Sequence, residues 1–194
     1  MSISEEMNTE YAVYEEEERK EFFVVPEGTY PAHAWTLNLK HQSKQVKSRD
    51  VQGKFHVADI YELEYKVADD VESMGFNDAD KLKGKVIRSN GVFVFKDPEG
   101  AKDCLPNPQG NWQYNNLLKV FGIKLKEKEI KDAKGNTRTV KVLPRLQEQQ
   151  VKGLPCSVTV KHRQWEDKTY ANVNRVDKWE KGKKLEDDLA DIPF

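Results

Sequence analysis

Five strand-like stretches, with one helical signal between the third and the fourth, limit most strongly the folds open to this chain. Apolar and polar residues alternate in these stretches, as they do in a β-strand with one buried face. The third stretch is broken by Asn90-Gly91, a dipeptide that favours a tight turn or a bulge. The expected strands lie at about residues 29–40, 55–67, 83–96, 156–163 and 169–176.

The helical signal follows a turn at residues 107–110, and Gly122 can end the helix. Its apolar residues, at near-helical spacing, are Trp112, Leu117, Leu118 and Phe121. Trp112 and Phe121 are expected in the core. Three strands, one helix and two strands predict an OB-fold, an all-β five-stranded Greek-key barrel with a helix between strands three and four. An SH3-like barrel or a split sandwich fits less well, because neither needs a helix there.

The segments between the strands are expected as connections. Residues 41–54 are interpreted as a loop or as the splayed tip of a hairpin, and residues 69–82 as an acidic loop. Residues 124–141 look like a charged, turn-rich insert, and residues 142–151 like a short helix or an extended segment. A turn at residues 164–168 joins the last two strands.

The net charge of −1 conceals three segments of very different charge. Residues 1–27 hold nine acidic and two basic side chains, and residues 186–194 hold four acidic side chains and no base. Residues 28–185 hold 30 basic and 20 acidic side chains. A polyanion-binding domain with acidic ends has this pattern, although solvated surfaces are charged in any protein.

This distribution predicts one folded domain with two tails. We expect a flexible acidic arm at 1–27, the OB-fold domain at 28–179 and a disordered acidic tail at 180–194. The sequence has no apolar run that could span a membrane and no signal peptide. Cys104 and Cys156 stand alone, so reduced thiols and a cytoplasmic location are expected, with Cys156 in the core.

No motif for catalysis, a cofactor or a metal is visible in the sequence. A phosphate-binding loop, a glycine-rich dinucleotide motif and a zinc-protease motif are all missing, and the four histidines have no ligand spacing. Asp69-Asp70, with Asp78 and Asp80, could bind a divalent ion, but a solvated acidic loop is the simpler interpretation. The sequence therefore predicts a protein that is not an enzyme and needs no cofactor.

Binding of single-stranded nucleic acid needs a basic groove for phosphates and exposed aromatic rings for bases. An OB-fold binds on strands two and three and on the loops that join strands one to two and four to five. Here those loops are residues 41–54, which are strongly basic, and residues 164–168, which carry Trp165. The predicted contact residues are Lys44, Lys47, Arg49, Lys54, Tyr61, Tyr65, Arg88, Lys161, Arg163, Trp165, Lys168 and Arg175.

The aromatic residues allow two interpretations each. Trp165 either stacks on a base or makes a capping contact, and the position of Trp35 is left open. One face of every barrel strand is core, which favours burial for the strand aromatics. The tyrosines among them are the better stacking candidates, because a buried hydroxyl needs a partner. These strand aromatics are Phe55, Tyr61, Tyr65, Phe93 and Phe95.

The last residues form an acidic run that ends in an apolar tip. Pro193 restricts the backbone. The Phe194 ring can fill an apolar pocket of a partner while the terminal carboxylate pairs with an Arg or Lys side chain at the rim. This ending resembles the C-terminal tip of bacterial single-stranded DNA-binding proteins. The resemblance implies binding to a polymerase, helicase or nuclease. It assigns this role to Asp187, Asp188, Asp191, Ile192, Pro193 and Phe194.

The body resembles bacteriophage replication proteins of this class, in residues 26–30 and 153–155. The bacterial family begins its barrel almost at residue one and has a long linker, whereas this barrel begins near residue 28 with a linker of about 180–185. The resemblance implies a non-catalytic, sequence-tolerant single-stranded DNA-binding protein for replication, recombination or repair, and it leaves open whether the protein forms a homo-oligomer. The alternatives are an adaptor or decoy that engages host factors through the tip, and an RNA-binding or annealing protein.

Overall fold

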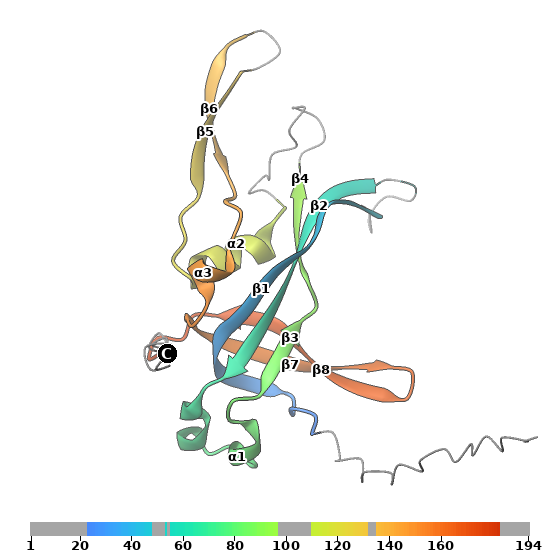
Figure 1. The fold of residues 1–194 in the computed structure, drawn as a ribbon, viewed down its shortest axis with the longest axis vertical. Coiled ribbons are helices and arrows are strands. Elements are labelled where there is room, and N and C mark those ends of the chain that lie inside the picture. Colours follow the sequence, from blue (N-terminus) through green and yellow to red (C-terminus); the bar gives the residue numbers. More distant parts are fainter. Residues whose placement is uncertain (1–22, 48–52, 54, 97–109, 132–134, 183–194) are drawn as a thin grey trace, which may run out of the picture.

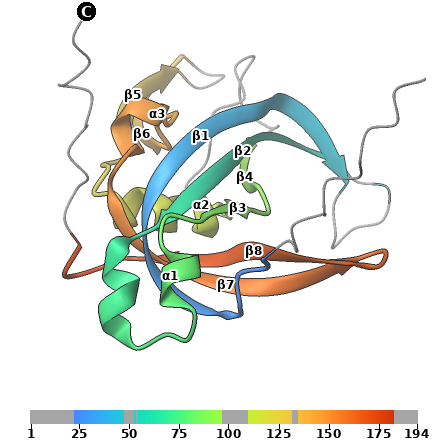
Figure 2. The ribbon, with the colours of Figure 1, turned by 60° about the horizontal axis from the view of Figure 1, so that its bottom comes forward.

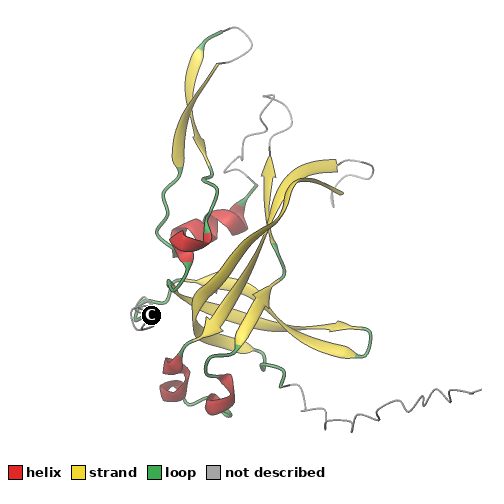
Figure 3. Cartoon of the chain, in the orientation of Figure 1, coloured by secondary structure: helices red, strands yellow, loops and turns green. Residues whose placement is uncertain are grey.

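The strands of this chain form a closed barrel and a separate hairpin (Figures 1 and 3). The computed structural model describes residues 23–47, 53, 55–96, 110–131 and 135–182. In these residues the barrel strands are β1 (Gly28–Lys47), β2 (Phe55–Val67), β3 (Val86–Ser89), β4 (Val92–Lys96), β7 (Pro155–Trp165) and β8 (Lys168–Asp177). The separate hairpin consists of β5 (Lys126–Lys131) and β6 (Thr137–Val142). The helices are η1 (Asp69–Met74, a 3-10 helix), α1 (Ala79–Leu82), α2 (Trp112–Val120) and α3 (Glu148–Val151).

The barrel closes because β1 pairs with both β2 and β7 in the sheet order β1-β7-β8-β3-β2-β4. β3 and β8 are parallel, with Arg88 opposite Asn172, and the other barrel pairs are antiparallel. β3 pairs with residues 64–66 of β2, and β4 with residues 57–61. Together β3 and β4 act as the third strand, which breaks at Asn90-Gly91 as predicted. With α2 between the third and fourth strands, the fold is the predicted OB-fold.

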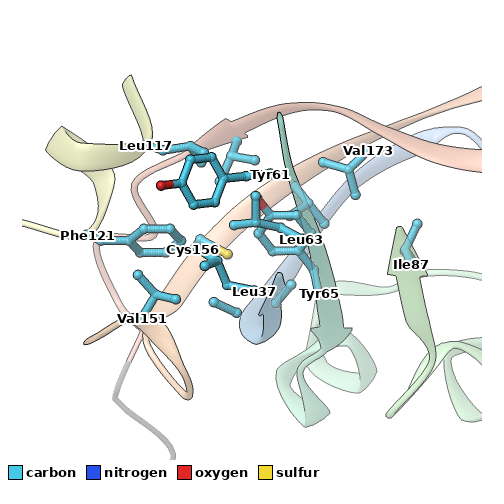
Figure 4. Close-up of a cluster of buried hydrophobic side chains, with 14 of the residues drawn as sticks. Leu37, Tyr61, Leu63, Tyr65, Ile87, Leu117, Phe121, Val151, Cys156 and Val173 are labelled. Carbon is cyan, nitrogen blue, oxygen red and sulfur yellow. The ribbon is translucent and has the colours of Figure 1, made fainter. Parts of the chain in front are cut away.

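Alternate residues of the strands fill the barrel with apolar side chains (Figure 4). The inward-facing residues of β2 are Tyr61, Leu63, Tyr65 and Val67. α2 covers this core with Leu117, and Phe121 follows at its end, buried as predicted. The Cys156 thiol of β7 also lies in the core, as predicted, and burial raises its pKa.

Side-chain amides of α2 and of its preceding residue tie this helix to two strands. Asn111 accepts a hydrogen bond from the Phe95 backbone N–H at 2.7 Å and donates one to the Phe95 carbonyl at 2.9 Å. Asn116 donates to the Val176 carbonyl at 2.7 Å. In the sheet order, β3 and β2 lie between β8 and β4. The helix α2 therefore bridges two strands that are not neighbours.

Several connections are more regular than the sequence indicates. Residues 41–47 extend β1, so β1 and β2 form one long hairpin in place of a loop. The 69–82 segment contains η1 and α1, and 124–141 contains the β5–β6 hairpin. The 142–151 segment ends in the short helix α3. The hairpin at 41–47 and the short helix near 151 were each one of two interpretations of the sequence, whereas η1, α1 and the β5–β6 hairpin were missed because most of their side chains face solvent and leave no clear apolar alternation.

The hydroxyls of two core tyrosines differ in their hydrogen bonds, which leads to a prediction. That of Tyr65 is buried without a partner among the described residues, whereas that of Tyr114 donates to Pro144 and accepts from the Leu146 N–H. Tyr65→Phe loses no hydrogen bond, so the free energy of unfolding should stay unchanged or rise by about 1 kcal/mol. The control, Tyr114→Phe, should lower it by about 1–3 kcal/mol. Urea denaturation measures both, and equal losses would contradict the prediction.

Candidate nucleic-acid interface

Two long hairpins, β1–β2 and β7–β8, project from the same side of the barrel (Figures 1 and 2). They correspond to the connections between strands one and two and between strands four and five of the OB-fold. β3 lies between β2 and β8 in the sheet, so the two hairpins flank the third strand. The predicted binding elements are therefore on one side of the molecule.

The β1–β2 hairpin presents basic and aromatic side chains to solvent. Lys44 and Lys47 are exposed on β1, and Lys47 is paired in register with Phe55, which is also exposed. Phe55 was expected in the core, but it begins β2 beyond the barrel wall, where there is no interior to face. Two other predicted residues of this hairpin, Arg49 and Lys54, lie outside the described residues.

A buried carboxylate anchors the base of this hairpin. Asp59 is 4% exposed. It forms ion pairs with Lys96 at 2.9 Å and with Arg145 at 3.8 Å. It also accepts the backbone N–H of Ser43 at 2.7 Å. Ser43 has a φ of 50°, in the left-handed region, and lies at an irregularity of the β1–β2 pairing. The carboxylate therefore holds the point from which the hairpin leaves the barrel.

The β7–β8 hairpin gathers two aromatic and two basic side chains on one face. Trp165 is 58% exposed, and the Arg163 guanidinium lies over its ring, 5.7 Å from the centroid. In the antiparallel register Arg163 is opposite Tyr170, and Trp165 is opposite Lys168. Directly opposite residues share a face of a strand pair, and Tyr170 is exposed as well. The hairpin turn occurs at Glu166, whose φ of 53° is also left-handed.

Tyr170 was not among the residues predicted from the sequence. Its place on the same face as Trp165 follows only from the pairing register around the turn. The available signal was the short turn between two alternating segments, which fixes the register once its length is known.

The middle of the candidate interface is nearly neutral. On β3, Arg88 donates to Glu64 of β2 at 2.7 Å, and Thr36 donates to the same carboxylate at 3.0 Å. These two contacts lower the pKa of Glu64. Lys40 and Glu62 form a further ion pair on this face. A polyanion that crosses this region therefore meets paired charges.

Two further predicted cations are already ion-paired. Lys161 pairs with Glu27 at 3.1 Å, and Arg175 pairs with Asp177 at 2.8 Å. The backbone N–H of His162 also donates to Glu27 and, with Lys161, lowers the pKa of this carboxyl. In the described part of the chain, the predicted cations without an ion pair are Lys44, Lys47, Arg163 and Lys168.

Two predicted stacking residues are wrong. Tyr61 and Tyr65 are 2% and 0% exposed, because they point into the barrel from the inward face of β2. Tyr61 packs against Tyr114, with 5.3 Å between ring centroids. Burial raises the pKa of both hydroxyls on β2. Their ring faces are therefore covered by core side chains and cannot receive a base.

The expectation for Trp112 is also wrong, in the opposite direction. It is 71% exposed, since it begins α2 on a side away from the buried Leu117 and Leu118. Trp35, which was left open, is partly buried, with the ammonium groups of Lys66 and Lys152 at 4.6 and 5.8 Å from its ring. Partial burial, together with these cations, leaves less of the Trp35 ring open to a nucleobase than of the Trp165 ring, which is 58% exposed.

The predicted partner-binding residues from Asp187 to Phe194 lie outside the described residues, as does the acidic arm up to residue 22. Over the described ranges, no three His, Cys, Asp or Glu side chains are grouped as metal ligands would be. Nor does any helix there have the length and apolar character needed to cross a membrane. No family model matches this chain, and no curated protein or solved structure matches it either.

Proposed function

We propose that this protein is a non-catalytic, sequence-tolerant single-stranded DNA-binding protein of replication, recombination or repair, acting in the cytoplasm. One observation carries the proposal: a single face of the β7–β8 hairpin combines the exposed rings of Trp165 and Tyr170 with Arg163 and Lys168. Stacking on such rings tolerates any base, because every base has a flat π-face. The two cations supply the contacts to phosphate.

The two hairpins share the work in this proposal. Lys44 and Lys47 hold phosphates at the β1–β2 hairpin, and Phe55 offers a further ring there. The strand then crosses β3, where Arg88 exchanges part of its pairing with Glu64 for a phosphate. The protein thus binds the DNA strand mainly at the two hairpins, and the contact between them is weak because the charges there are already paired.

The acidic C-terminal tip has a second role in the proposal. Asp191-Ile192-Pro193-Phe194 and the acids before it resemble a recruitment motif, and their chemistry suits an apolar pocket with a basic rim. We propose that this tip binds partner proteins such as a polymerase, helicase or nuclease. The tip has no basic side chain, so it should not increase the affinity for DNA.

Titration of the intact protein with oligo-dT at several salt concentrations tests the DNA-binding role. Tryptophan fluorescence should be quenched, and log K should fall with log salt with a slope of about −3 if the four unpaired hairpin cations each neutralise one phosphate of a single strand. Deletion of residues 186–194 should leave the affinity unchanged or raise it, because competing acid is removed.

Each alternative gives a different result in this titration. No binding at low salt, even after the deletion, would contradict the proposal and favour an adaptor that acts through the tip. Tighter binding of oligo-U than of oligo-dT would favour the RNA-binding role, because only contacts to the 2′-hydroxyl distinguish the two.

A further inference from the structure

A pocket of about 580 Å³ lies between α2, the β3–β4 turn and β8. Its inner wall includes Tyr65, Leu117 and Val173 of the core (Figure 4). Its volume is within the range of about 300–1,000 Å³ that is usual for small-molecule sites. Trp112, the most exposed large apolar side chain of the described residues, also lines it. A large ring that faces solvent beside a pocket is placed to cover a flat ligand.

The polar lining of this pocket is rich in side-chain amides. It includes Lys119 and Arg175, and no carboxylate is among its lining residues. Lys119 forms no ion pair within the described ranges, whereas Arg175 is paired with Asp177. Amides both donate and accept hydrogen bonds, as base edges do, and the cations favour an anionic group. The amide residues are Asn90, Gln113, Asn115, Asn116 and Asn174, of which Asn116 already donates to the Val176 carbonyl.

The pocket and the candidate interface share strands β3 and β8. In the parallel β3–β8 pair, Arg88 is opposite Asn172, and the next pair along is Ser89 opposite Val173. Ser89 and Val173 both line the pocket. Successive residues of a strand point to opposite faces of a sheet, so a DNA strand on the Arg88 face would reach the pocket around the β3–β4 turn, which also lines it.

We propose that this pocket takes up one nucleotide unit of the bound strand, with its base against Trp112, its base edge on the amides and its phosphate near Lys119 and Arg175. The inference rests on the proposed function and extends it. It gives the protein a third anchoring point, separate from the two hairpins. It also puts Trp112, which is not part of the β7–β8 hairpin, in contact with DNA.

Two substitutions test this pocket without disturbing the core. Trp112→Leu removes an exposed ring, and it should weaken oligo-dT binding about 5-fold to 150-fold, the loss expected for one stacked base. Asn174→Asp puts a carboxylate beside the phosphate position and should weaken binding at least as strongly as a lost phosphate contact. Thr139→Asp, on the β5–β6 hairpin that projects from the barrel in Figure 1, adds the same charge elsewhere and should have little effect.

Photo-crosslinking of the intact protein with oligo-dT that contains 5-iododeoxyuridine locates the contact. A crosslinked peptide that contains Trp112, lost in Trp112→Leu, is the expected result. If the oligonucleotide binds and crosslinks only at Trp165, and Trp112→Leu binds like the unmodified protein, the pocket inference is overturned while the proposed function stands. If the unmodified protein does not bind oligo-dT at all, both are overturned.

Discussion

Replacing Asp59 by alanine is expected to lower the free energy of unfolding by about 3–5 kcal/mol. The carboxylate pairs with Lys96 at 2.9 Å, and both side chains are less than one tenth exposed. Removing one partner leaves the ammonium buried without an opposite charge, which is far less favourable than losing a surface pair. Among the described residues, Lys96 then keeps its hydrogen bond to the Ser43 hydroxyl at 2.8 Å and no ion pair, and the left-handed Ser43 backbone loses its acceptor.

Urea denaturation followed by circular dichroism measures this effect. The matched control is Glu62→Ala, which removes an acid of the same sheet whose pair with Lys40 is exposed, so its loss should be about 1 kcal/mol or less. Combining Asp59→Leu with Lys96→Met should recover most of the stability, because no charge is then left buried. If Asp59→Ala and Glu62→Ala lower the free energy of unfolding by the same amount, the buried ion pair does not stabilise the base of the hairpin.

Replacing Trp165 by alanine should weaken oligo-dT binding by about 1–3 kcal/mol, the range for loss of one base stack. Arg163 lies over the ring, and the ring is more than half exposed, so a base has access to it. The salt dependence should stay the same, because the ring carries no charge, whereas Lys168→Ala should reduce the slope by about 0.7.

Fluorescence anisotropy of a labelled oligo-dT gives both the affinity and its salt dependence. Trp165→Phe is the matched control, since it keeps an aromatic surface and should restore most of the affinity. The melting temperature should be nearly unchanged in both variants, because the side chain is outside the core. An unaltered affinity in Trp165→Ala would make the ring part of the scaffold.

The sequence predicts the barrel well because burial leaves a pattern. The alternation at 55–67 matches the bounds of β2, and the Asn90-Gly91 break separates β3 from β4 as expected. The extension of β1 to Lys47 could not be decided between a loop and a hairpin, and the β5–β6 hairpin was missed, since both are solvated and their pairing leaves little apolar period. Burial of the strand aromatics is confirmed for Tyr61 and Tyr65, whereas their assignment as contact residues, which rested on the need of a buried hydroxyl for a partner, is wrong.

The candidate site was predicted only where local chain geometry decides it. A tryptophan beside a charged hairpin turn is exposed whatever the rest of the barrel does, and Trp165 is. Ion pairing depends on distant segments: Lys161 meets Glu27, which is 134 residues away in the chain. Whether a cation is available to phosphate is therefore a property of the folded barrel, and composition gives no guide to it.

The parallel pairing of β3 with β8 also determines when, during folding, the two hairpins come to lie on one side of the barrel. Each hairpin is local, with Trp165 only three residues from its partner Lys168, and can form soon after it leaves the ribosome. Their mutual placement depends on Arg88 meeting Asn172 and on Gly28 meeting Val160, contacts between the two ends of the domain. Such long-range pairings form slowly. A nascent or truncated chain that lacks β8 would therefore have neither the β7–β8 hairpin nor the pairing that places it beside β3, and under the proposed function it should not bind DNA.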